Sequence, residues 1–205
     1  MDFIRVELEE KYIADVESRE ECIAFSVYIK SGDFSGRGTF VYTVNQFRQL
    51  ISQLKLIYIT LDGVQDPGNL GTIIRTAVAA GVKGIFLMKG TVDPFNDKTV
   101  RSTMSALHKI PLYEDITLSL LHDMVTESNM TTYVTALEHS NPYHTVRYAK
   151  RTMLVLGNEG NGVTPEVMNL CTNRIMIPMY GDMESLNVSV AAALCMYKVQ
   201  EQLMP

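Results

Sequence analysis

The sequence predicts an α/β fold in which a mostly parallel β-sheet is covered by helices on both faces. From about Leu54 onward, short apolar runs with the composition of buried strands alternate with segments of helical periodicity, an order that is typical of parallel sheets joined by helices. The 205 residues are 46% hydrophobic, which is enough for a sizeable core and favours one main domain. Only 20% are charged, which argues against a largely disordered chain.

The expected elements follow one another regularly. Apolar runs rich in β-branched and aromatic residues indicate strands, and apolar residues three or four positions apart indicate helices. Strands are expected at 54–61, 84–88, 110–113, 131–137, 152–157 and 174–178. Helices are expected from Leu70 to Gly81, over a face formed by Val100, Met104 and Leu107, over 116–128, from Thr164-Pro165 onward, and finally to about Leu203.

The first fifty residues fit this alternation poorly. Gly32, Gly36 and Gly38 suggest a loop, and we expect no independent domain in so short a segment. The expected organisation is therefore a short acidic extension over residues 1–50 and the main domain over residues 51–205.

Charge is unevenly distributed along the chain. The net charge of −5 is already reached within residues 1–21, which hold eight acidic residues against Arg5, Lys11 and Arg19. The remainder sums to zero, so the chain lacks the global basic field of many nucleic-acid-binding proteins, and local clusters would have to bind any RNA. Two such clusters are Arg101, His108 and Lys109, and Arg147, Lys150 and Arg151. Each could also be ordinary solvated charge.

Cysteine usage and hydropathy indicate a cytoplasmic protein. Cys22, Cys171 and Cys195 are widely spaced and form no CxxC pair, which argues against a zinc site and a disulfide framework. We therefore expect no metal. The sequence starts with an acidic stretch rather than a basic and then apolar leader, and no apolar run is long enough to cross a bilayer, so no membrane association is expected.

Three segments carry chemistry, and the first, DPGNLGTIIRTA, covers residues 66–77. The letters DPGN form a turn signal, and Arg75 follows on a helix from which its side chain can project back toward the turn. The segment comes after an expected strand, and ligands of open parallel sheets bind at the carboxyl ends of strands. An arginine that extends from a half-buried helix to solvent, or one paired with an acid, would give the same pattern.

The second segment, LVLGNEGNGVTPE, covers residues 154–166. Its closely spaced glycines follow a buried strand and would let the backbone approach a ligand closely. Glu159 within it is either an exposed turn residue or a carboxylate of a site. The GxGxxG spacing of a dinucleotide-binding fingerprint is missing, which argues against a nucleotide-dependent oxidoreductase.

The third segment, IPMYGDMESLNVSVAAALCMYK, covers residues 177–198. A strand ends at Pro178, a glycine-containing loop follows, and the letters SLN open a helix. Ser185 or Asn187 could simply be the N-cap of that helix. An apolar stripe at helical spacing is formed by Leu186, Val190, Leu194 and Tyr197, and close packing against another backbone is indicated by Ser189, Ala191, Ala192 and Ala193.

In this order and at these spacings, the three segments resemble the motifs of the SpoU/TrmH-type RNA ribose 2′-O-methyltransferases of the SPOUT class. The resemblance covers about residues 54–205. It implies a SPOUT fold whose C-terminal chain passes through a loop to form a deep trefoil knot, although true knots are very rare. It also implies a homodimer with the knotted region at the interface, and S-adenosylmethionine as methyl donor. Residues 51–205 would then be the catalytic domain, and residues 1–50 could be a remnant of an RNA-binding domain.

The resemblance also implies roles for individual residues. Arg75 matches the family's catalytic arginine and Asn69 the asparagine of the first motif, while catalytic roles near the ribose are implied for Glu159, Ser185 and Asn187. Backbone contacts to S-adenosylmethionine are implied for Gly157, Ile177 and Leu186, with Glu159, Gly160, Met179 and Asn187 beside the cofactor. RNA contacts are expected at Arg75, Arg101, Lys109 and Arg151.

The implied reaction is an in-line methyl transfer, in which positioning the 2′-hydroxyl against the methyl carbon supplies much of the rate. The hydroxyl gains from losing its proton, and the family account makes arginine the base. A guanidinium is, however, essentially always protonated in proteins. We therefore expect Arg75 to bind the adjacent phosphate or to stabilise the developing alkoxide, with a proton relay as a further role.

Two departures from the family pattern bear on the substrate. Many members carry a sizeable N-terminal RNA-binding domain, whereas here only residues 1–50 precede the core, and Ser105 stands where relatives usually carry glycine. The form of the first segment favours structured ribosomal RNA over tRNA as the substrate. A tRNA methyltransferase and a non-catalytic module that binds S-adenosylmethionine and RNA are the alternatives. The intact set of motif residues argues for an enzyme.

Overall fold

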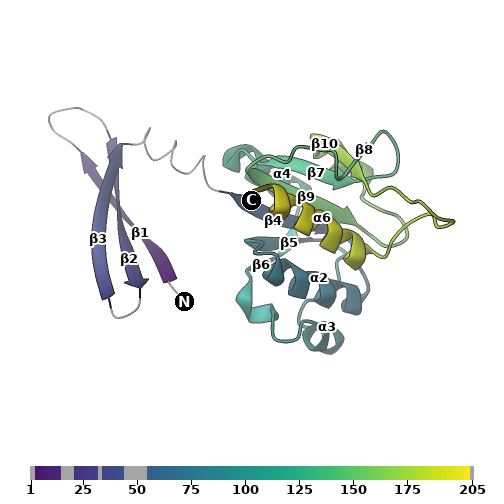
Figure 1. Cartoon of the computed structure of the whole chain (residues 1–205), viewed down its shortest axis with the longest axis horizontal. Helices are drawn as coiled ribbons and strands as arrows, with labels where there is room; N and C mark the ends of the chain where they lie inside the picture. The colour runs from purple at the N-terminus through teal and green to yellow at the C-terminus, as the bar shows by residue number, and fades with distance from the viewer. Residues whose placement is uncertain (1–2, 15–20, 32–33, 44–54, 204–205) are drawn as a thin grey trace. The chain divides into compact units, whose positions relative to one another are not determined.

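The computed structural model describes residues 3–14, 21–31, 34–43 and 55–203. The chain divides into two compact units, Met1–Leu54 and Lys55–Pro205. The first unit holds an antiparallel sheet of three strands in the order β1-β2-β3 (Figure 1). Their bounds are β1 (Phe3–Ala14), β2 (Glu21–Ser31) and β3 (Phe34–Thr43).

The loop that the sequence suggests in this first unit is not found at Gly36 and Gly38. Both glycines lie in β3, where they pair with Ile29 and Val27 of β2. Glycine keeps both of its backbone hydrogen-bonding groups, so pairing with a long neighbouring strand outweighs its weak preference for strands. Gly32 lies outside the described residues.

The second unit contains a sheet of seven strands in the order β6-β5-β4-β9-β7-β10-β8. Every neighbouring pair in this sheet is parallel, which confirms the parallel sheet that the sequence predicts. The strands are β4 (Leu56–Asp62), β5 (Gly84–Met88), β6 (Leu112–Ile116), β7 (Thr131–Thr135), β8 (Asn141–Pro142), β9 (Arg151–Gly157) and β10 (Asn173–Met176). The two-residue strand β8 has no counterpart among the predicted strands.

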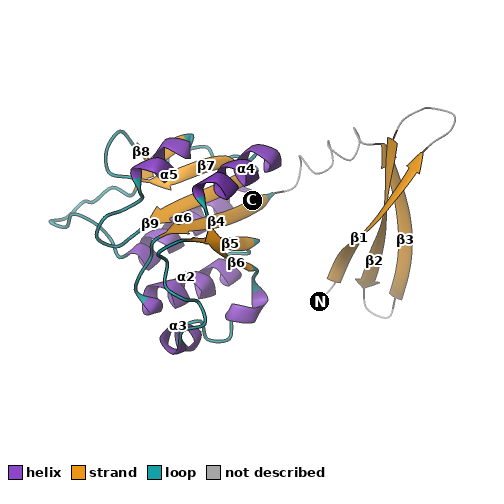
Figure 2. Ribbon diagram, turned by 180° about the vertical axis from the view of Figure 1, so that it is seen from behind, coloured by secondary structure: helices purple, strands orange, loops and turns teal. Residues whose placement is uncertain are grey.

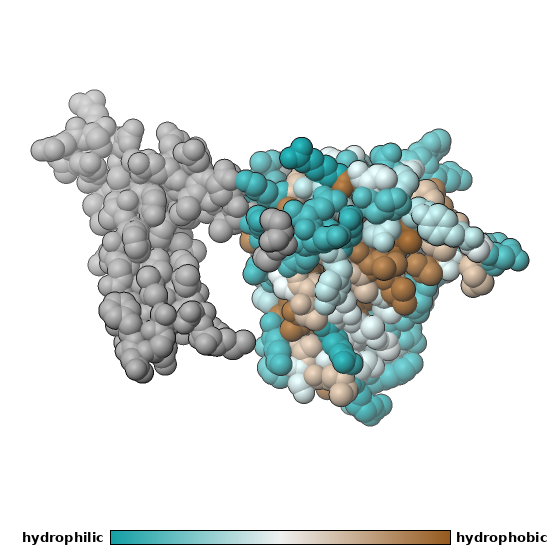
Figure 3. All heavy atoms as spheres, viewed as in Figure 1, coloured by the Kyte–Doolittle hydropathy of each residue, from teal (hydrophilic) through white to brown (hydrophobic). Residues whose placement is uncertain are grey.

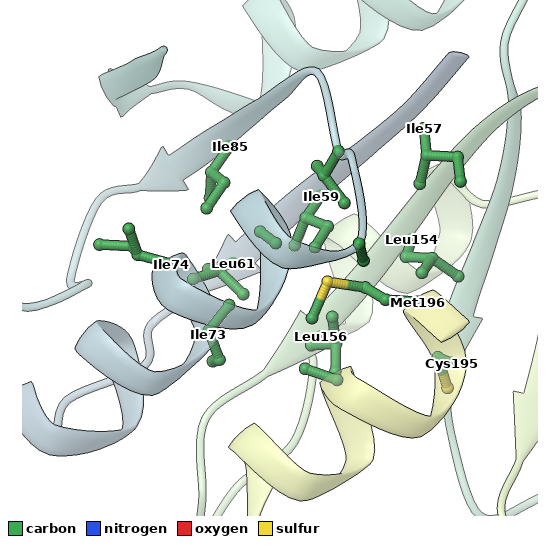
Figure 4. Packing of buried hydrophobic residues seen from close by; sticks show 14 of the residues in the cluster. Ile57, Ile59, Leu61, Ile73, Ile74, Ile85, Leu154, Leu156, Cys195 and Met196 are labelled. Atoms are coloured by element: carbon green, nitrogen blue, oxygen red, sulfur yellow. The ribbon is translucent and has the colours of Figure 1, made fainter. Parts of the chain in front are cut away.

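Helices cover both faces of the seven-stranded sheet (Figures 1 and 2). They are α2 (Pro67–Ala79), α3 (Asp97–Ser102), α4 (Leu118–Ser128), α5 (Pro165–Leu170) and α6 (Val188–Leu203). Buried residues of α2 and α6 share a hydrophobic cluster with Ile85 and Leu87 of β5, whereas those of α4 and α5 share a second cluster with Phe86 and Met88. Successive strand residues point to opposite faces, so the two clusters lie on opposite sides of the sheet. Figure 4 shows α2, α6 and the central strands meeting in the first cluster.

The local sequence explains where α2 begins and ends. The side chain of Asp66 accepts a hydrogen bond from the Asn69 N–H at 2.9 Å, and Pro67 occupies the first turn, where its missing N–H costs nothing. The helix ends before Gly81, which has a φ of 70° that favours glycine. The helical spacing of Leu70, Ile73, Ile74, Ala77 and Val78 predicts the inner face of this helix. The first four are fully buried and Val78 is partly buried against the same core.

The predicted helix face of Val100, Met104 and Leu107 is wrong. Helix α3 ends at Ser102, and a separate 3-10 turn covers Leu107–Lys109. Val100 and Met104 are 41% and 68% exposed, and Met104 and Ser105 adopt positive φ values of 48° and 67°.

The reason for this difference is the close packing of α3 against α2. A Cβ on Gly71 of α2 would lie 2.4 Å from the Cβ of Ser102 and 2.8 Å from the carbonyl oxygen of Thr99. Helix α3 therefore turns Thr99 toward α2, and both Thr99 and Thr103 are buried. Val100 and Met104, which sequence periodicity assigned to the inner face, lie outside it, whereas Leu107 is partly buried and packs against the core from the 3-10 turn.

Candidate functional site

The three segments singled out in the sequence follow strands of the seven-stranded sheet at one edge. The chain proceeds from β4 to β5 and β6 on one side of β4, and later places β9 on its other side. Ligands of open parallel sheets bind at the carboxyl ends of the strands, where the strand order changes direction in this way. Asp62 ends β4 and lies opposite Gly157, which ends β9. The loops that follow these two strands therefore start side by side.

The loop after β9 is a tight turn closed by its own backbone. Asn158 and Gly162 exchange two backbone hydrogen bonds of 2.9 and 3.0 Å, and Oδ1 of Asn158 accepts from the N–H groups of Gly160 and Asn161. A Cβ on Gly157 would lie 2.1 Å from the carbonyl carbon of Gly162. The loop itself therefore requires glycine at position 157, independently of any ligand.

Glu159 in this loop is bound to the turn that precedes α2. Its carboxylate accepts hydrogen bonds from the N–H groups of Gln65 and Asp66, both at 3.2 Å, and from Nδ2 of Asn69 at 3.0 Å. Burial by itself raises the pKa of the Glu159 carboxyl, but the bonds from Asn69 and the backbone outweigh it and place the pKa below its ordinary value. The group is thus an ionised acceptor that joins two loops, and a weak base.

Asn69 connects this pair to the third segment. Its Oδ1 accepts a hydrogen bond from Nδ2 of Asn187 at 2.9 Å. Oδ1 of Asn187 in turn accepts from the N–H and the hydroxyl of Ser189, at 2.9 and 2.6 Å. Asn187 immediately precedes α6, so this contact is an N-cap. Of the two N-cap candidates in the sequence, Asn187 holds this position, and the helix begins after it rather than at Ser185.

A buried carboxylate that the sequence did not single out anchors the far end of the β9 loop. Oδ2 of Asp62 accepts from the N–H and the hydroxyl of Thr164, both at 2.7 Å, and Asp62 is only 6% exposed. Nδ2 of Asn158 donates to the carbonyl of Gly63 at 2.8 Å. The loop is therefore attached at both of its ends, to Asp62 at the end of β4 and to Gly63 directly after it. The position of Asp62 at the end of a predicted strand was the available signal for a polar site residue.

A second residue that sequence reasoning missed is Lys98, near the start of α3. Its Nζ lies 3.2 Å from Oδ2 of Asp66, the cap of α2. The hydrogen bond from the Asn69 N–H and the contact with Lys98 hold the pKa of Asp66 below its ordinary value. Both partners are exposed, so the pair adds a cation to the rim of the site rather than stability.

Arg75 lies on α2 but takes no part in this network. Its side chain is exposed and has no hydrogen bond or ion pair with any described residue. It stands six residues after Asn69, which is about 9 Å further along the helix axis. The alternative of an arginine paired with an acid is thus not found, and the guanidinium is open to an anion from outside the described chain.

The loop between β10 and α6 carries the remaining predicted cofactor contacts. Ile177 and Met179 are half-buried, whereas Ser185 is exposed and Leu186 is 38% exposed. None of the backbone groups of residues 177–186 forms a hydrogen bond to another described residue. Gly160 in the β9 loop has no positive φ, and a Cβ on it would meet only Oδ1 of Asn158 at 3.6 Å. The structure thus joins Asn69, Glu159 and Asn187 directly and leaves Ser185 and Arg75 unlinked.

The predicted RNA contacts lie at two different places. Arg101 is exposed in the last turn of α3, whose first turn reaches the site through Lys98. Lys109 and Arg151 lie instead at or before the amino ends of β6 and β9. The length of β9 separates Arg151 from Gly157 by about 20 Å. Arg151 therefore cannot contact the same nucleotide as the loops at the carboxyl ends.

The described residues contain no cluster of His, Cys, Asp or Glu that could hold a metal ion. Among the same residues, no helix has both the length and the apolar character needed to cross a membrane. What the site offers is neutral amides, carboxylates already committed to hydrogen bonds at Asp62, Asp66 and Glu159, unbonded backbone groups and nearby cations. This set suits the binding and orientation of polar ligands.

Comparisons with known proteins agree on one family. Residues 56–197 match the model of the SpoU rRNA Methylase family. Over 142 residues the chain is 40% identical to the 23S rRNA (guanosine(2553)-2′-O)-methyltransferase RlmP of Bacillus subtilis (strain 168), an overlap of 69% of this chain and 57% of RlmP.

Solved structures show the same fold. An AdoMet-bound rRNA methyltransferase from Sinorhizobium meliloti superposes with a TM-score of 0.68 at 35% identity, covering 75% of this chain and 59% of that one. The SpoU methyltransferase AviRb from Streptomyces viridochromogenes, in complex with AdoMet, gives a TM-score of 0.68 at 28% identity, covering 73% and 58%. This chain spans somewhat over half the length of these three relatives.

Proposed function

This chain belongs to the SpoU rRNA Methylase family, and on that premise we propose that it transfers a methyl group from S-adenosylmethionine to a ribose 2′-hydroxyl of structured RNA. Ribosomal RNA is favoured over tRNA, because a relative with 40% identity is named as a 23S rRNA 2′-O-methyltransferase. One observation carries the proposal. The hydrogen-bonded link from Glu159 through Asn69 to Asn187 gathers all three segments at the edge where parallel sheets bind ligands.

The residues at this edge fit S-adenosylmethionine. The unbonded backbone groups of residues 177–186 can pair with the edges of an adenine ring, and Ile177, Met179 and Leu186 supply apolar contact. Gly157 lets the β9 loop close on its own backbone, and the space beside Gly160 is open except for Oδ1 of Asn158 at 3.6 Å from a Cβ. When bound, S-adenosylmethionine supplies an electrophilic methyl carbon. Two structural relatives are described as AdoMet-bound, which supports this choice of cofactor.

We assign Arg75 to the RNA rather than to the cofactor. It is an exposed cation without a described partner, set on the helix that begins at the site. A guanidinium offers several donors in one plane, so it can hold a phosphate and stabilise an alkoxide at the neighbouring 2′ position. Permanent protonation makes it a poor general base.

Glu159 acts in this proposal as a positioning residue. Its carboxylate already accepts three hydrogen bonds and its pKa is lowered, so it is a weak proton acceptor. Asn69 and Asn187 hold the first and third segments in register. Ser185, two residues before Asn187, has an exposed side chain with no hydrogen bond to a described residue. Positioning of the ribose supplies most of the rate under this assignment.

We also propose a homodimer and a C-terminal knot, as the family resemblance implies. The proposed RNA substrate points to a cytoplasmic location. The dimer is supported by an apolar stripe on α6, where Val190, Leu194 and Tyr197 are 47%, 37% and 53% exposed. Figure 3 shows hydrophobic side chains gathered over this helix. The knot is supported by the path of the chain, because α6 returns from β10 to pack against α2 and β9.

Mapping of ribose methylation tests the activity directly. Ribosomal RNA and tRNA from cells with and without the gene should differ at one 2′-O-methyl position in ribosomal RNA. Purified protein with S-adenosylmethionine should restore that methyl group in RNA from the deletion strain. A difference confined to tRNA would support the alternative substrate. Donor binding without restoration in any RNA would indicate a non-catalytic module.

A further inference from the structure

The edge of the seven-stranded sheet opposite the candidate site carries a row of basic residues. Lys55 and Lys83 directly precede β4 and β5, Lys109 precedes β6 by three residues, and Arg151 is the first residue of β9. Strands β6, β5, β4 and β9 are neighbours in this order and run parallel, so their amino ends lie side by side. The three lysines are exposed. We name these four residues the basic edge.

Acidic residues gather at the end of the strands remote from the basic edge, where Lys89 and Lys98 are interspersed among them. At or beyond the carboxyl ends of β4, β5 and β9 stand the acidic residues Asp62, Asp66, Asp93, Asp97 and Glu159. The described acids at the opposite end include Glu127 in the last turn of α4, and Glu201 near the end of α6, which pairs with Lys198 at 2.8 Å. The basic edge is therefore a local positive surface on a chain whose net charge is −5.

Two tyrosine rings lie beside the basic edge on one face of the sheet. Tyr58 of β4 and Tyr113 of β6 flank Gly84, on which a Cβ would lie 3.1 Å from an atom of each ring. Both rings pack on Phe86, with centroids 5.5 and 5.0 Å away. Tyr113 is 44% exposed, so part of its ring is open to a stacking partner.

Arg151 belongs to the same face of the sheet. Arg151 pairs with Leu56 of β4, two residues before Tyr58, so the side chains of Arg151 and Tyr58 start on the same face. Burial and the neighbouring Tyr113 raise the pKa of Tyr58, while the charge of Arg151 opposes them. Nε of Arg151 has no hydrogen-bond partner among the described residues. Among the described residues, no acid forms an ion pair with Arg151.

We propose that the basic edge and Tyr113 form a second RNA-binding surface, with the cations on phosphates and the exposed ring under an unpaired base. Cations beside stacking aromatic rings are the composition of surfaces that bind single-stranded RNA. The proposal rests on RNA being the substrate and adds where a remote part of it binds. Because β9 separates the two edges by about 20 Å, an RNA that contacts both must be long or folded. A short fragment around the target nucleotide would reach only the candidate site.

The test compares charge removal with charge retention at the same positions. The triple variant Lys55→Gln, Lys83→Gln, Lys109→Gln removes three cations, whereas Lys55→Arg, Lys83→Arg, Lys109→Arg keeps them. Binding of labelled oligouridylate and of a labelled ribosomal RNA fragment is measured between about 50 and 200 mM salt. Log affinity falls linearly with log salt, and the glutamine variant should make this fall less steep by about two units of slope for a single strand. The arginine variant should leave the slope unchanged. Tyr113→Ala should weaken oligouridylate binding roughly tenfold at every salt concentration.

Calorimetry with S-adenosylmethionine and methyl transfer by the wild-type protein separate this inference from the proposed function. Equal slopes for the glutamine and arginine variants in a protein that transfers methyl groups would overturn the second surface and leave the activity standing. If the wild-type protein transfers no methyl group but the salt dependence of RNA binding is less steep in the glutamine variant, the second surface would be supported and the proposed activity refuted. Retained binding of S-adenosylmethionine by the glutamine variant shows that the variant is folded.

Discussion

Asn187 donates its side-chain amide to Oδ1 of Asn69 at 2.9 Å, across 118 residues of sequence. Asn69 donates in turn to Glu159, so a single amide side chain joins the loops that follow β4, β9 and β10. An amide is suited to this position because it donates and accepts at once. An aspartate at position 69 would have no donor for the carboxylate of Glu159 and would place a second negative charge beside it.

Glu159→Gln should remove a pH-dependent part of the stability. Although burial raises the pKa of Glu159, its hydrogen bonds place it below the ordinary value of 4.5 in the folded protein. Such a carboxylate stabilises the fold fully above its unfolded pKa, and the contribution is lost as pH falls through the folded pKa. The variant should be about 1 kcal/mol less stable at neutral pH, a small value for an exposed site, and the difference should vanish as pH falls below 4.5.

Denaturant titrations at several pH values measure this difference. Glu138→Gln is the matched control, because Glu138 is exposed and its carboxylate accepts no hydrogen bond from the described residues. It should leave the free energy of unfolding unchanged over the same range. A difference for Glu159→Gln that stays constant with pH would contradict the assigned carboxylate contacts.

Gly157→Ala should destabilise the protein even without any ligand. The added Cβ would lie about 2 Å from the backbone of Gly162 and Val163, so the β9 loop must shift, at a cost of roughly 2 kcal/mol or more. Gly160→Ala in the same loop is the control, since its Cβ would meet only Oδ1 of Asn158 at 3.6 Å. Equal free energies of unfolding for the two variants would show that the loop tolerates a side chain at 157.

Sequence periodicity predicted the elements whose burial follows the local pattern. The apolar runs of β4, β5 and β9 and the inner face of α2 are buried as expected. Prediction failed where packing partners decide the outcome. The inner face of α3 follows from the approach of Gly71 to Ser102, and no pattern within 97–107 records that approach. The strand β3 forms through its pairing with β2, although its glycines suggest a loop.

The candidate site was predictable only in part for a related reason. Turn and glycine signals marked each loop, but the bonds that unite the loops join positions 90 and 118 residues apart. Local patterns do not contain such pairs, and it was the resemblance to a family that indicated Asn69, Glu159 and Asn187 together. The sequence does not mark Asp62 or Lys98, because a single acid after a strand and a single lysine on a short helix are common on protein surfaces.

Leu194→Glu should convert a dimer to monomers if the exposed stripe of α6 is the interface. Leu194 is 37% exposed and lies between Val190 and Tyr197 on this stripe, where a buried charge without a partner would be costly. Light scattering should give about twice 23.0 kDa for the wild-type chain and the monomer mass for the variant. Leu120→Glu, at a 45% exposed leucine of α4, is the control and should stay dimeric. A wild-type mass of 23.0 kDa would refute the dimer.

Arg75→Ala should abolish most methyl transfer while leaving the fold and donor binding intact. The side chain is exposed and unbonded among the described residues, so its loss should change the free energy of unfolding by less than about 0.5 kcal/mol. The loops assigned to S-adenosylmethionine do not contact it through any described hydrogen bond, so donor affinity should stay the same. Single-turnover transfer to ribosomal RNA should fall on the order of a hundredfold, as for loss of a group that stabilises charge in the transition state.

Arg75→Lys distinguishes a simple positive charge from a planar group of donors. An ammonium keeps the charge but cannot place two parallel donors on a phosphate and a 2′-oxygen at once. We therefore expect RNA affinity close to that of the wild type and transfer between those of the alanine variant and the wild type. Full activity in Arg75→Lys would mean that charge alone suffices. Normal turnover in Arg75→Ala would make the arginine a surface residue, and loss of donor binding would move it into the cofactor site.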